Sequence, residues 1–382
     1  MLRLVALAAQ ASVIFLAAYN ALTALWGWPN QRPSPPGGRQ RKFRVLIPAH
    51  NEEGVIGNLL GDLANTTYPQ NNITTIVLAD RCTDRTVEIS RAAGILVAVR
   101  SAGPPGKGAA LQWYLESAPL DEETLLILDA DNRIDSHLLE QIADSMDEGH
   151  CVVQCYLDIA NPGGSPLAEA SALSYWAGNR MVQLARSNLG WAADLGGTGM
   201  AFTSEALNAV GGFSESLTED QEIGVRLALA GYPTHWLHDA RVRDEKPEDI
   251  GVVVRQRARW MAGKRATRRK HLAALLKTRS IMTFDLAIRL VQPGRAFVAL
   301  VSGILTVLSA ATGSNWLFPW QVWGAVTAVQ VAEPIPFLAR EGVEPRRLAR
   351  YPLLIILAAL WIPIRFASSR VSGWYHTPHR GS

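Results

Sequence analysis

Two aspartates separated by a single residue, Asp129 and Asp131, follow the apolar run Leu125–Leu128. Two carboxylates at positions i and i+2 after a strand can turn toward one hard divalent cation, which prefers oxygen ligands. A cation held there can bridge the oxygens of a diphosphate and neutralise it as it leaves. A pair of aspartates after a strand is more often only a solvated loop. The prediction of an Mg²⁺ or Mn²⁺ site at Asp129 and Asp131 therefore depends on its surroundings.

The elements around this pair alternate between strand-like and helical patterns. The β-rich runs are Phe43–Ile47, Ile73–Ala79, Ile95–Val99, Thr124–Leu128 and Cys151–Leu157. The helical patterns between them are Glu53–Leu63, Arg85–Ala93, Gly108–Ser117 and Ser136–Met146. This alternation predicts an α/β fold with a mostly parallel sheet and helices on both faces. Ligands bind beyond the carboxyl ends of such strands, so we expect Asp80 and Asp129 on the same rim.

The chain becomes less regular after this alternation. A helix is expected near Ala168–Ser187 and another around Gln221–Ala230, with the glycine cluster Gly196-Gly197-Thr198-Gly199 between them. Asp220 stands close to Glu219 and Glu222, and nearby like charges raise the pKa of a carboxyl group and make it a better base. An acidic helix N-terminus favoured by the helix dipole is the alternative, and both can hold. The helical run Val252–Lys277 is basic and can bind anionic lipid headgroups.

Charge is missing from two long stretches, between Arg3 and Arg32 and between Arg295 and Glu333. About 20 apolar residues cross a bilayer, so the first stretch predicts one membrane helix and the second predicts two short ones. Basic residues cluster after the first stretch. This distribution predicts a protein of the cell (inner) membrane whose N-terminus lies outside and whose central domain lies in the cytoplasm. A cleaved signal peptide is disfavoured because the apolar run is long and no small-residue cleavage site follows it.

The segments after the basic helix are also apolar. Ile281–Gln292 is amphipathic, with Asp285 and Arg289 as its charged residues, and is expected to lie in the membrane interface. Ala296–Ala311 and Trp316–Leu338 predict a helical hairpin. The last apolar segment, Tyr351–Ile364, is short for a span.

Five segments resemble, in order, the membrane-integrated members of glycosyltransferase family 2, such as cellulose, hyaluronan and poly-N-acetylglucosamine synthases and their non-processive relatives. They are Val45–Glu52, Asp80–Asp84, Asp129–Asp131, Thr218–Asp220 and Gln256–Trp260, the last matching the family's Gln-x-x-Arg-Trp. Each segment is common alone, but the set in this order is specific. The resemblance implies a GT-A type (Rossmann-like) cytoplasmic domain and metal-dependent, inverting sugar transfer from a nucleotide diphosphate-sugar.

The resemblance also implies residue roles. Asp220 would be the general base that takes the proton of the acceptor hydroxyl as it attacks the anomeric carbon. Arg259 would be the guanidinium fork on the leaving diphosphate. Nucleotide-sugar binding is assigned to Pro48, Ala49, Asn51, Glu52, Asp80, Lys107, Asp129, Ala130, Asp131 and Arg259. Acceptor binding is assigned to Gly197, Thr198, Gly199, Glu219, Gln256 and Trp260. Without the motif, Trp260 would be a membrane-interface anchor and Lys107 a solvated loop lysine.

The expected organisation has six parts. They are a transmembrane helix at 1–31, a linker at 32–42, the GT-A catalytic domain at 43–280, an interfacial helix at 281–295, transmembrane or interfacial helices at 296–370, and a cytoplasmic tail at 371–382. Trp374–Thr377 resembles the family's cytoplasmic Trp-x-x-Thr tail, whereas three spans after the catalytic domain would leave the C-terminus outside. A last helix that does not span would reconcile the two.

The membrane segments look too few for the export channel of polymer-secreting family members. We therefore expect transfer from a UDP-hexose or UDP-N-acetylhexosamine to a lipid, lipid-linked or other glycan acceptor. A processive exopolysaccharide synthase is the alternative. No nucleic-acid partner is expected, and a homo-oligomer is allowed. A nucleotidyltransferase would have no use for Gln-x-x-Arg-Trp, and an inactive binding module would be expected to have lost an acidic motif. The sequence leaves the sugar open.

Overall fold

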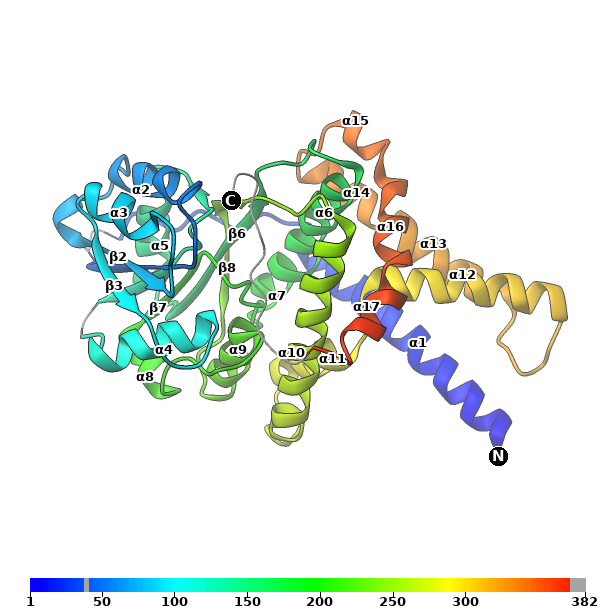
Figure 1. Cartoon of the computed structure of the whole chain (residues 1–382). Helices are drawn as coiled ribbons and strands as arrows, with labels where there is room; N and C mark the ends of the chain where they lie inside the picture. The colour runs from blue at the N-terminus through cyan, green and yellow to red at the C-terminus, as the bar shows by residue number, and fades with distance from the viewer. Residues whose placement is uncertain (38–40, 122, 372–382) are drawn as a thin grey trace.

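The computed structural model describes residues 1–37, 41–121 and 123–371. It shows an α/β body from which an arm of apolar helices extends (Figure 1). Over the described residues, the body contains one sheet with the strand order β3-β2-β1-β4-β7-β6-β8-β5. The strands are β1 Phe43–Ala49, β2 Ile73–Asp80, β3 Leu96–Arg100, β4 Thr124–Ile127, β5 Arg133–Ile134, β6 Val152–Ile159, β7 Met200–Thr203 and β8 His235–Asp244.

The sheet is mixed rather than mostly parallel. Strand β1 pairs in parallel with β2 and β4, and β2 pairs in parallel with β3, as expected from the alternation. Strand β7, however, is antiparallel to both β4 and β6. The sequence did not indicate β7 because it is only four residues long and follows the glycine cluster. Strand β8 was also missed, because six of its ten residues are polar or charged.

Helices cover both faces of the sheet, as predicted. They include α2 Ile56–Ala64, α3 Thr86–Ala92, α4 Lys107–Ser117, α5 Leu138–Asp147 and α9 Glu219–Leu229. Successive residues of a strand point to opposite faces. Val45 of β1 therefore packs in the core beneath α2 and α5, whereas its neighbour Leu46 packs in the core beneath α4 and α9. The α/β fold expected from the sequence is confirmed.

The second half of the body contains helices of very different lengths. Helix α6 Pro166–Gly178 continues through a π-helical turn, Asn179–Leu184, into α7 Ala185–Asn188. Helix α8 Ser204–Ala209 follows β7. Helix α10 Ile250–Lys277 is the longest in the body, and the carboxylate of Asp249 caps it by accepting the Val252 N–H at 2.9 Å. Helix α10 packs against α9 and against α11 Ile281–Val291.

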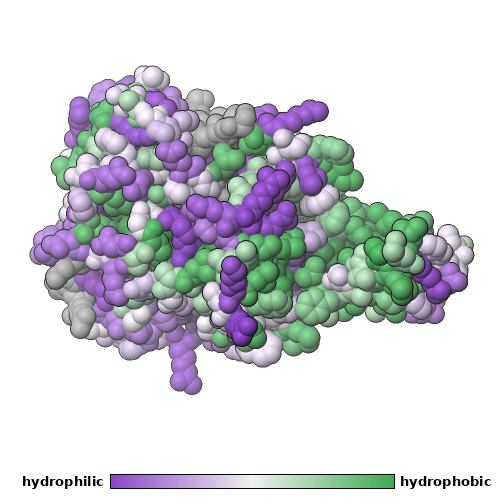
Figure 2. All heavy atoms as spheres, turned by 90° about the horizontal axis from the view of Figure 1, so that it is seen from below, coloured by the Kyte–Doolittle hydropathy of each residue, from purple (hydrophilic) through white to green (hydrophobic). Residues whose placement is uncertain are grey.

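Among the described residues, three helical stretches are long and apolar enough to cross a membrane: Leu2–Gly27, Arg295–Thr312 and Trp320–Arg340. They consist of α1 Leu2–Ala24 with the short turn Leu25–Gly27, α12 Arg295–Thr312, and α13 Trp320–Ala332 with α14 Pro334–Arg340. These stretches form the arm (Figure 1). Viewed from below, hydrophobic surface covers the arm and hydrophilic side chains dominate the body (Figure 2).

The last apolar segment does not form a fourth long helix. Helix α15 Pro345–Leu348 leads into a 3-10 turn at Tyr351–Leu353, α16 Leu354–Ala359 and α17 Trp361–Ala367. These short helices pack against α6, α10 and α12, at the place where the arm meets the body. The expected tail with Trp374–Thr377 lies outside the described residues, apart from Val371.

Helix α11 carries its charged residues on the buried side. Asp285 is fully buried, and its carboxylate accepts the hydroxyl of Tyr19 from α1 at 2.8 Å. Arg186 and Arg289 form ion pairs with the same carboxylate at 3.3 and 2.9 Å. The exposed side chains of α11 are apolar, Phe284 among them. The expected polar face of this helix is therefore an internal contact that joins the arm to the body.

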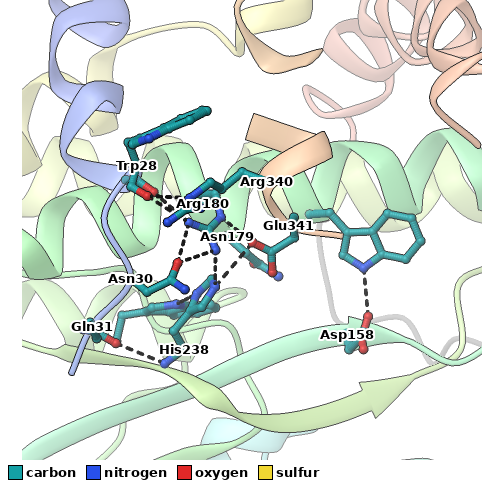
Figure 3. Close-up of polar contacts among 12 residues, drawn as sticks. Trp28, Asn30, Gln31, Asp158, Asn179, Arg180, His238, Arg340 and Glu341 are labelled. Carbon is teal, nitrogen blue, oxygen red and sulfur yellow. Dashed lines mark hydrogen bonds and ion pairs between the residues drawn. The ribbon is translucent and has the colours of Figure 1, made fainter. Parts of the chain in front are cut away.

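A second buried cluster, here called the arm junction, joins four distant parts of the chain (Figure 3). Arg180 from the π-helical turn forms an ion pair with Glu341, just after α14, at 2.5 Å. Its Nη1 also donates to the Gly27 carbonyl at 3.1 Å and to Asn30 Oδ1 at 3.0 Å. His238 of β8 accepts the indole N–H of Trp236 at 3.1 Å and lies 3.3 Å from Glu341. The first and last helices of the arm are thereby fixed to the sheet.

Candidate active site

A cavity of about 710 Å³ lies beyond the carboxyl ends of β1, β2 and β4. Most of the residues proposed from the sequence line it. They are Pro48, Ala49, Glu52, Asp80, Lys107, Asp129, Ala130, Asp131, Gly197, Thr198, Glu219, Asp220, Gln256, Arg259 and Trp260. Residues at the end of β1 and residues of α10 thus line the same cavity, although they are far apart in the sequence.

Two proposed residues, Asn51 and Gly199, do not line the cavity. Asn51 follows β1 with a left-handed backbone (φ 57°), and its Oδ1 accepts the Thr83 N–H at 2.8 Å, which ties the end of β1 to the end of β2. Gly199 has a φ of 61°, and a Cβ atom there would lie 3.0 Å from Val242 and 3.1 Å from Cys155. Both positions shape the cavity from outside.

Asp80, at the end of β2, is held between two arginines. Arg81 donates to its carboxylate from Nε at 3.1 Å and from Nη2 at 2.8 Å. The nearly buried Arg100 donates from Nη1 at 3.0 Å. Arg81 has a left-handed backbone (φ 54°), a strained conformation for a residue with a side chain. The sequence motif identified Asp80 but not Arg100, whose position depends on the pairing of β3 with β2.

The backbone at Asp129 is fixed by the glycine cluster. Its N–H donates to Asn132 Oδ1 at 2.9 Å and to Thr198 Oγ1 at 3.0 Å. Lys107, the first residue of α4, forms an ion pair with the Asp129 carboxylate and donates to the Gly197 carbonyl at 2.7 Å. Burial opposes the charge of Lys107, but the negative charges of Asp129 and Glu219 outweigh burial and raise the pKa of Lys107.

The carboxylates of Asp129 and Asp131 could supply part of the ligands of a divalent cation. Asp129 and Asp131 both line the cavity, and the Asp129 side chain is 40% exposed. No cluster of three or more His, Cys, Asp or Glu side chains suited to a metal ion occurs within residues 1–37, 41–121 and 123–371. Magnesium is typically bound by one or two carboxylates together with substrate phosphates and water. The residues therefore fit a cation that is completed by a diphosphate.

The start of α9 brings two carboxylates into the same cavity. Burial and the adjacent Asp220 raise the pKa of Glu219 to about 7. Burial also raises the pKa of Asp220, while Lys107 and Arg259 oppose that rise. A Cβ atom at Gly197 would lie 3.4 Å from Asp220 Oδ2, so the glycine cluster directly faces this carboxylate.

Helix α10 closes the cavity with Gln256, Arg259 and Trp260. Its distance from α9 is set at Gly263, where a Cβ atom would lie 2.3 Å from Thr218 Oγ1. One turn further, Glu222 of α9 binds Lys270 and His271 of α10 at 2.9 and 3.0 Å. Two independent contacts therefore hold the acidic start of α9 against the basic helix.

The sequence did not indicate the charged loop between β8 and α10. Residues 244–249 all line the cavity, and His50, Leu157, Asn161 and Tyr175 line it as well. Lys246 donates to Asp244 Oδ2 at 2.6 Å and lies 4.1 Å from the centre of the Tyr175 ring. Five charged residues among six, just before the Gln-x-x-Arg-Trp helix, are a sequence signal that could have identified this loop.

A model of the family described as "Glycosyltransferase like family 2" matches residues 40–263, which is more than half of the chain. The chain belongs to this family, and its body has the GT-A, Rossmann-like fold. A mannosyltransferase from Pyrobaculum calidifontis, solved in complex with GDP-Man and Mn²⁺, has the same fold. It is 18% identical with a TM-score of 0.62, and the match covers 93% of this chain and 99% of that one.

The chain matches only part of the length of its curated relatives. A probable glycosyltransferase, YdaM, of Bacillus subtilis is 28% identical over 64% of this chain and 60% of its own length. A beta-monoglucosyldiacylglycerol synthase of a Nostoc species is 27% identical over 64% of this chain and 53% of its own length. A probable glucomannan 4-beta-mannosyltransferase of rice, Oryza sativa, is 25% identical over 87% of this chain and 59% of its own length. This chain therefore spans little more than half the length of these relatives.

Proposed function

We propose that the chain is an inverting glycosyltransferase that moves a sugar from a UDP-hexose or UDP-N-acetylhexosamine to a lipid or lipid-linked acceptor. The observation that carries the proposal is the meeting of three groups in one cavity: the Asp129–Asp131 pair, the partly buried carboxylate of Asp220, and Arg259 with Trp260 from α10. Each group suits one part of a displacement at an anomeric carbon.

The donor end of the cavity suits a nucleoside diphosphate. Asp80 can accept an N–H from the base, and its two arginines keep the carboxylate in place. Asp129 and Asp131 would hold Mg²⁺ or Mn²⁺, which would neutralise the diphosphate as it leaves. Lys107 and Arg259 add positive charge on the same side of the cavity, and the guanidinium group suits two phosphate oxygens.

At the acceptor end of the cavity, the carboxylate of Asp220 would serve as the general base. Asp220 would take the proton of the acceptor hydroxyl while its oxygen bonds to the anomeric carbon and the bond to the diphosphate breaks. Attack from the side opposite the leaving group gives inversion in a single displacement. Trp260 and Gln256 lie on one side of α10, since they are four residues apart, and would form the floor under the acceptor.

A lipid acceptor is supported by the membrane arm and by one relative. The cavity lies between α6 and α10, the helices against which α16 and α17 pack at the root of the arm. The Nostoc relative is named for a glycolipid product. The similarity to the rice glucomannan 4-beta-mannosyltransferase favours the second candidate, a processive synthase of an exopolysaccharide.

The proposed topology follows from the arm. One crossing by α1 from an outside N-terminus would bring the body into the cytoplasm, and the α12–α14 hairpin would cross and return. The short helices α16 and α17 would stay on the cytoplasmic side, because they pack against the body. In this arrangement the expected cytoplasmic tail would need no fourth span.

The function is tested with the full chain in nanodiscs of defined lipids, supplied with UDP-sugars and Mg²⁺ or Mn²⁺. We expect release of UDP and a lipid that gains the mass of one sugar in mass spectrometry. A long polymer would establish the second candidate. Release of sugar 1-phosphate from the UDP-sugar would contradict both, because it indicates nucleotidyl transfer.

A further inference from the structure

Four arginines gather where α10 and α17 pack together: Arg265, Arg268 and Arg269 of α10, and Arg365 of α17. They are here called the arginine cluster. The three residues of α10 are spaced i, i+3 and i+4, so they share one face of the helix. Burial and the nearby charges of Arg365, Arg269 and Arg268 lower the pKa of Arg265.

The cluster has no counter-charge in the described part of the chain. None of its four guanidinium groups forms an ion pair with a carboxylate of a described residue, and Arg265 donates to the neutral Ser368 hydroxyl at 2.7 Å. Helix α10 carries nine lysines and arginines and no acidic residue. By contrast, the buried arginines Arg180, Arg186 and Arg289 each contact a carboxylate. The positive charge of the cluster is therefore uncompensated.

The position of the cluster relates it to the membrane arm. Trp361, the first residue of α17, stacks on Phe297 of the arm helix α12 with ring centres 3.8 Å apart. Arg365 follows Trp361 by about one helical turn. Beside it, Ile362 and Phe366 are 52% and 71% exposed, although both are strongly apolar. Figure 2 shows hydrophilic side chains on the body directly beside the hydrophobic arm.

The chemistry of this surface matches a lipid that carries phosphate. Guanidinium groups bind phosphate oxygens through paired N–H donors, and their charge favours headgroups with net negative charge. Exposed apolar side chains next to basic ones are typical of segments that lie at the boundary between headgroups and acyl chains. A soluble phosphate would have no use for Ile362 and Phe366, so the surface favours a lipid over a free anion.

We propose that Arg265, Arg268, Arg269 and Arg365 form a binding surface for the phosphate headgroups of anionic phospholipids, with Ile362 and Phe366 among the acyl chains. This role is independent of the proposed sugar transfer. It has a structural consequence for the site, because Arg265 follows Arg259 by six residues, or about 9 Å along the axis of the same helix. Bound headgroups would fix the helix that closes the cavity relative to the bilayer.

The test measures lipid selectivity, not turnover. The full chain is reconstituted in phosphatidylcholine membranes with spin-labelled phosphatidylglycerol or phosphatidylcholine, and electron spin resonance gives the ratio of the two lipids at the protein surface. We expect selectivity for phosphatidylglycerol. One basic residue near an anionic membrane contributes roughly fivefold in affinity, so R268Q/R269Q should lower the ratio by about fivefold or more.

The matched control is R85Q/R91Q, which removes the same charge from one exposed position just before α3 and one within it, far from the arm in Figure 1. It should leave the selectivity unchanged. An equal loss in R85Q/R91Q, or an unchanged ratio in R268Q/R269Q, would overturn the proposal. Calorimetry of the detergent-solubilised protein with inorganic phosphate separates the other source. Saturable binding at micromolar phosphate that R268Q/R269Q abolishes would also overturn it, since the site would then serve a soluble anion.

Discussion

Two glutamates three residues apart on α9 differ sharply in their surroundings. Glu219 is buried beside Asp220, and its pKa is raised to about 7. Glu222 is also buried, but hydrogen bonds from Ser214, Lys270 and His271 outweigh burial and lower its pKa to about 2. Burial destabilises a carboxylate unless partners compensate it. The first glutamate is thus placed where protons can be exchanged, and the second serves as a fixed anion between two helices.

The base assignment predicts that Asp220→Asn reduces sugar transfer by about 10²- to 10⁴-fold, because the amide cannot accept the acceptor's proton. Metal-dependent binding of UDP should persist, since Asp129 and Asp131 are unchanged. Asp239→Asn, at an exposed position outside the cavity, is the control. Rates of UDP release and calorimetry with UDP give the two readouts. Turnover of D220N within tenfold of the unmodified chain would contradict the role.

The metal assignment predicts a different pattern for Asp131→Ala. Its affinity for UDP should no longer rise when Mn²⁺ is added, whereas the weak affinity without metal should stay the same. Calorimetric titrations with UDP in the presence of Mn²⁺ and of a chelator measure both values. A normal metal-dependent gain in D131A would remove this residue from the metal site.

Glu222 gives a prediction about stability and pH. Its pKa in the folded protein lies below the ordinary value of 4.5, so its stabilising effect is present above pH 4.5 and is lost as the pH falls toward 2. Glu222→Gln should lower the free energy of unfolding by about 2–3 kcal/mol at pH 7, with a smaller difference from the unmodified chain at pH 3. Thermal unfolding in detergent at both pH values tests this. An equal difference at both would show that the charge is not involved.

At the scale of elements, the contact between α9 and α10 determines how the acidic and basic halves of the cavity face each other. Gly263 and Thr218 meet where a Cβ atom has no room. Gly263→Ala should therefore push α10 outward, at a cost of about 1–3 kcal/mol, and reduce turnover along with stability. Gly61→Ala on α2, where nothing lies within 4 Å of the new Cβ atom, should be neutral or slightly stabilising.

The rescue variant makes this test specific. Adding Thr218→Ala to Gly263→Ala removes the two closest atoms, Oγ1 at 2.3 Å and Cγ2 at 2.6 Å, and leaves the Cβ at 2.9 Å, so part of the stability and turnover should return. The measured quantities are the unfolding midpoint in detergent and the rate of UDP release. If the double variant is as impaired as Gly263→Ala alone, the close approach of the two helices is not the cause.

The elements that could be predicted from the sequence are those set by local patterns. The predicted start of β1 at Phe43 and the predicted end of α4 at Ser117 agree with the structure, because the pattern of apolar residues and the flanking turns are encoded locally. The antiparallel β7 and the polar β8 depend on partners distant in sequence. The buried orientation of the charged residues of α11 could not be predicted for the same reason, because the partner of Asp285 is Tyr19, which is distant in sequence.

In the candidate site too, the residues that belong to local motifs could be predicted, and the residues that depend on distant partners could not. Motifs fixed the acidic residues and the Gln-x-x-Arg-Trp helix, and the structure brings fifteen of the proposed residues to one cavity. Arg100 was missed because it reaches the site only through the pairing of β3 with β2. The loop of residues 244–249 was missed although its run of charged residues stands in the sequence, because its position beside the cavity depends on the pairing of β8 with β6.

At the scale of the whole molecule, the arm junction links the apolar helices of the arm to the sheet through buried charges. Glu341→Met should destabilise the protein by about 3–5 kcal/mol, because Arg180 keeps its buried charge without a partner. R180M/E341M should be less destabilised than the sum of the single variants, since it leaves no unpaired charge. Unfolding midpoints of the four proteins in one detergent give the coupling. Additive losses would show that the ion pair does not join the arm to the body.

The arm junction also has a consequence for synthesis on the ribosome. Arg180 lies near the middle of the chain, and its partners are Gly27 and Asn30 near the beginning and Glu341 near the end. While the catalytic region is being translated, only the early partners exist. The body therefore reaches its final packing only after the last helix of the arm has been made. A chain that stops before residue 341, or whose hairpin fails to insert, would expose an unpaired charge that the cell's quality-control proteases can recognise.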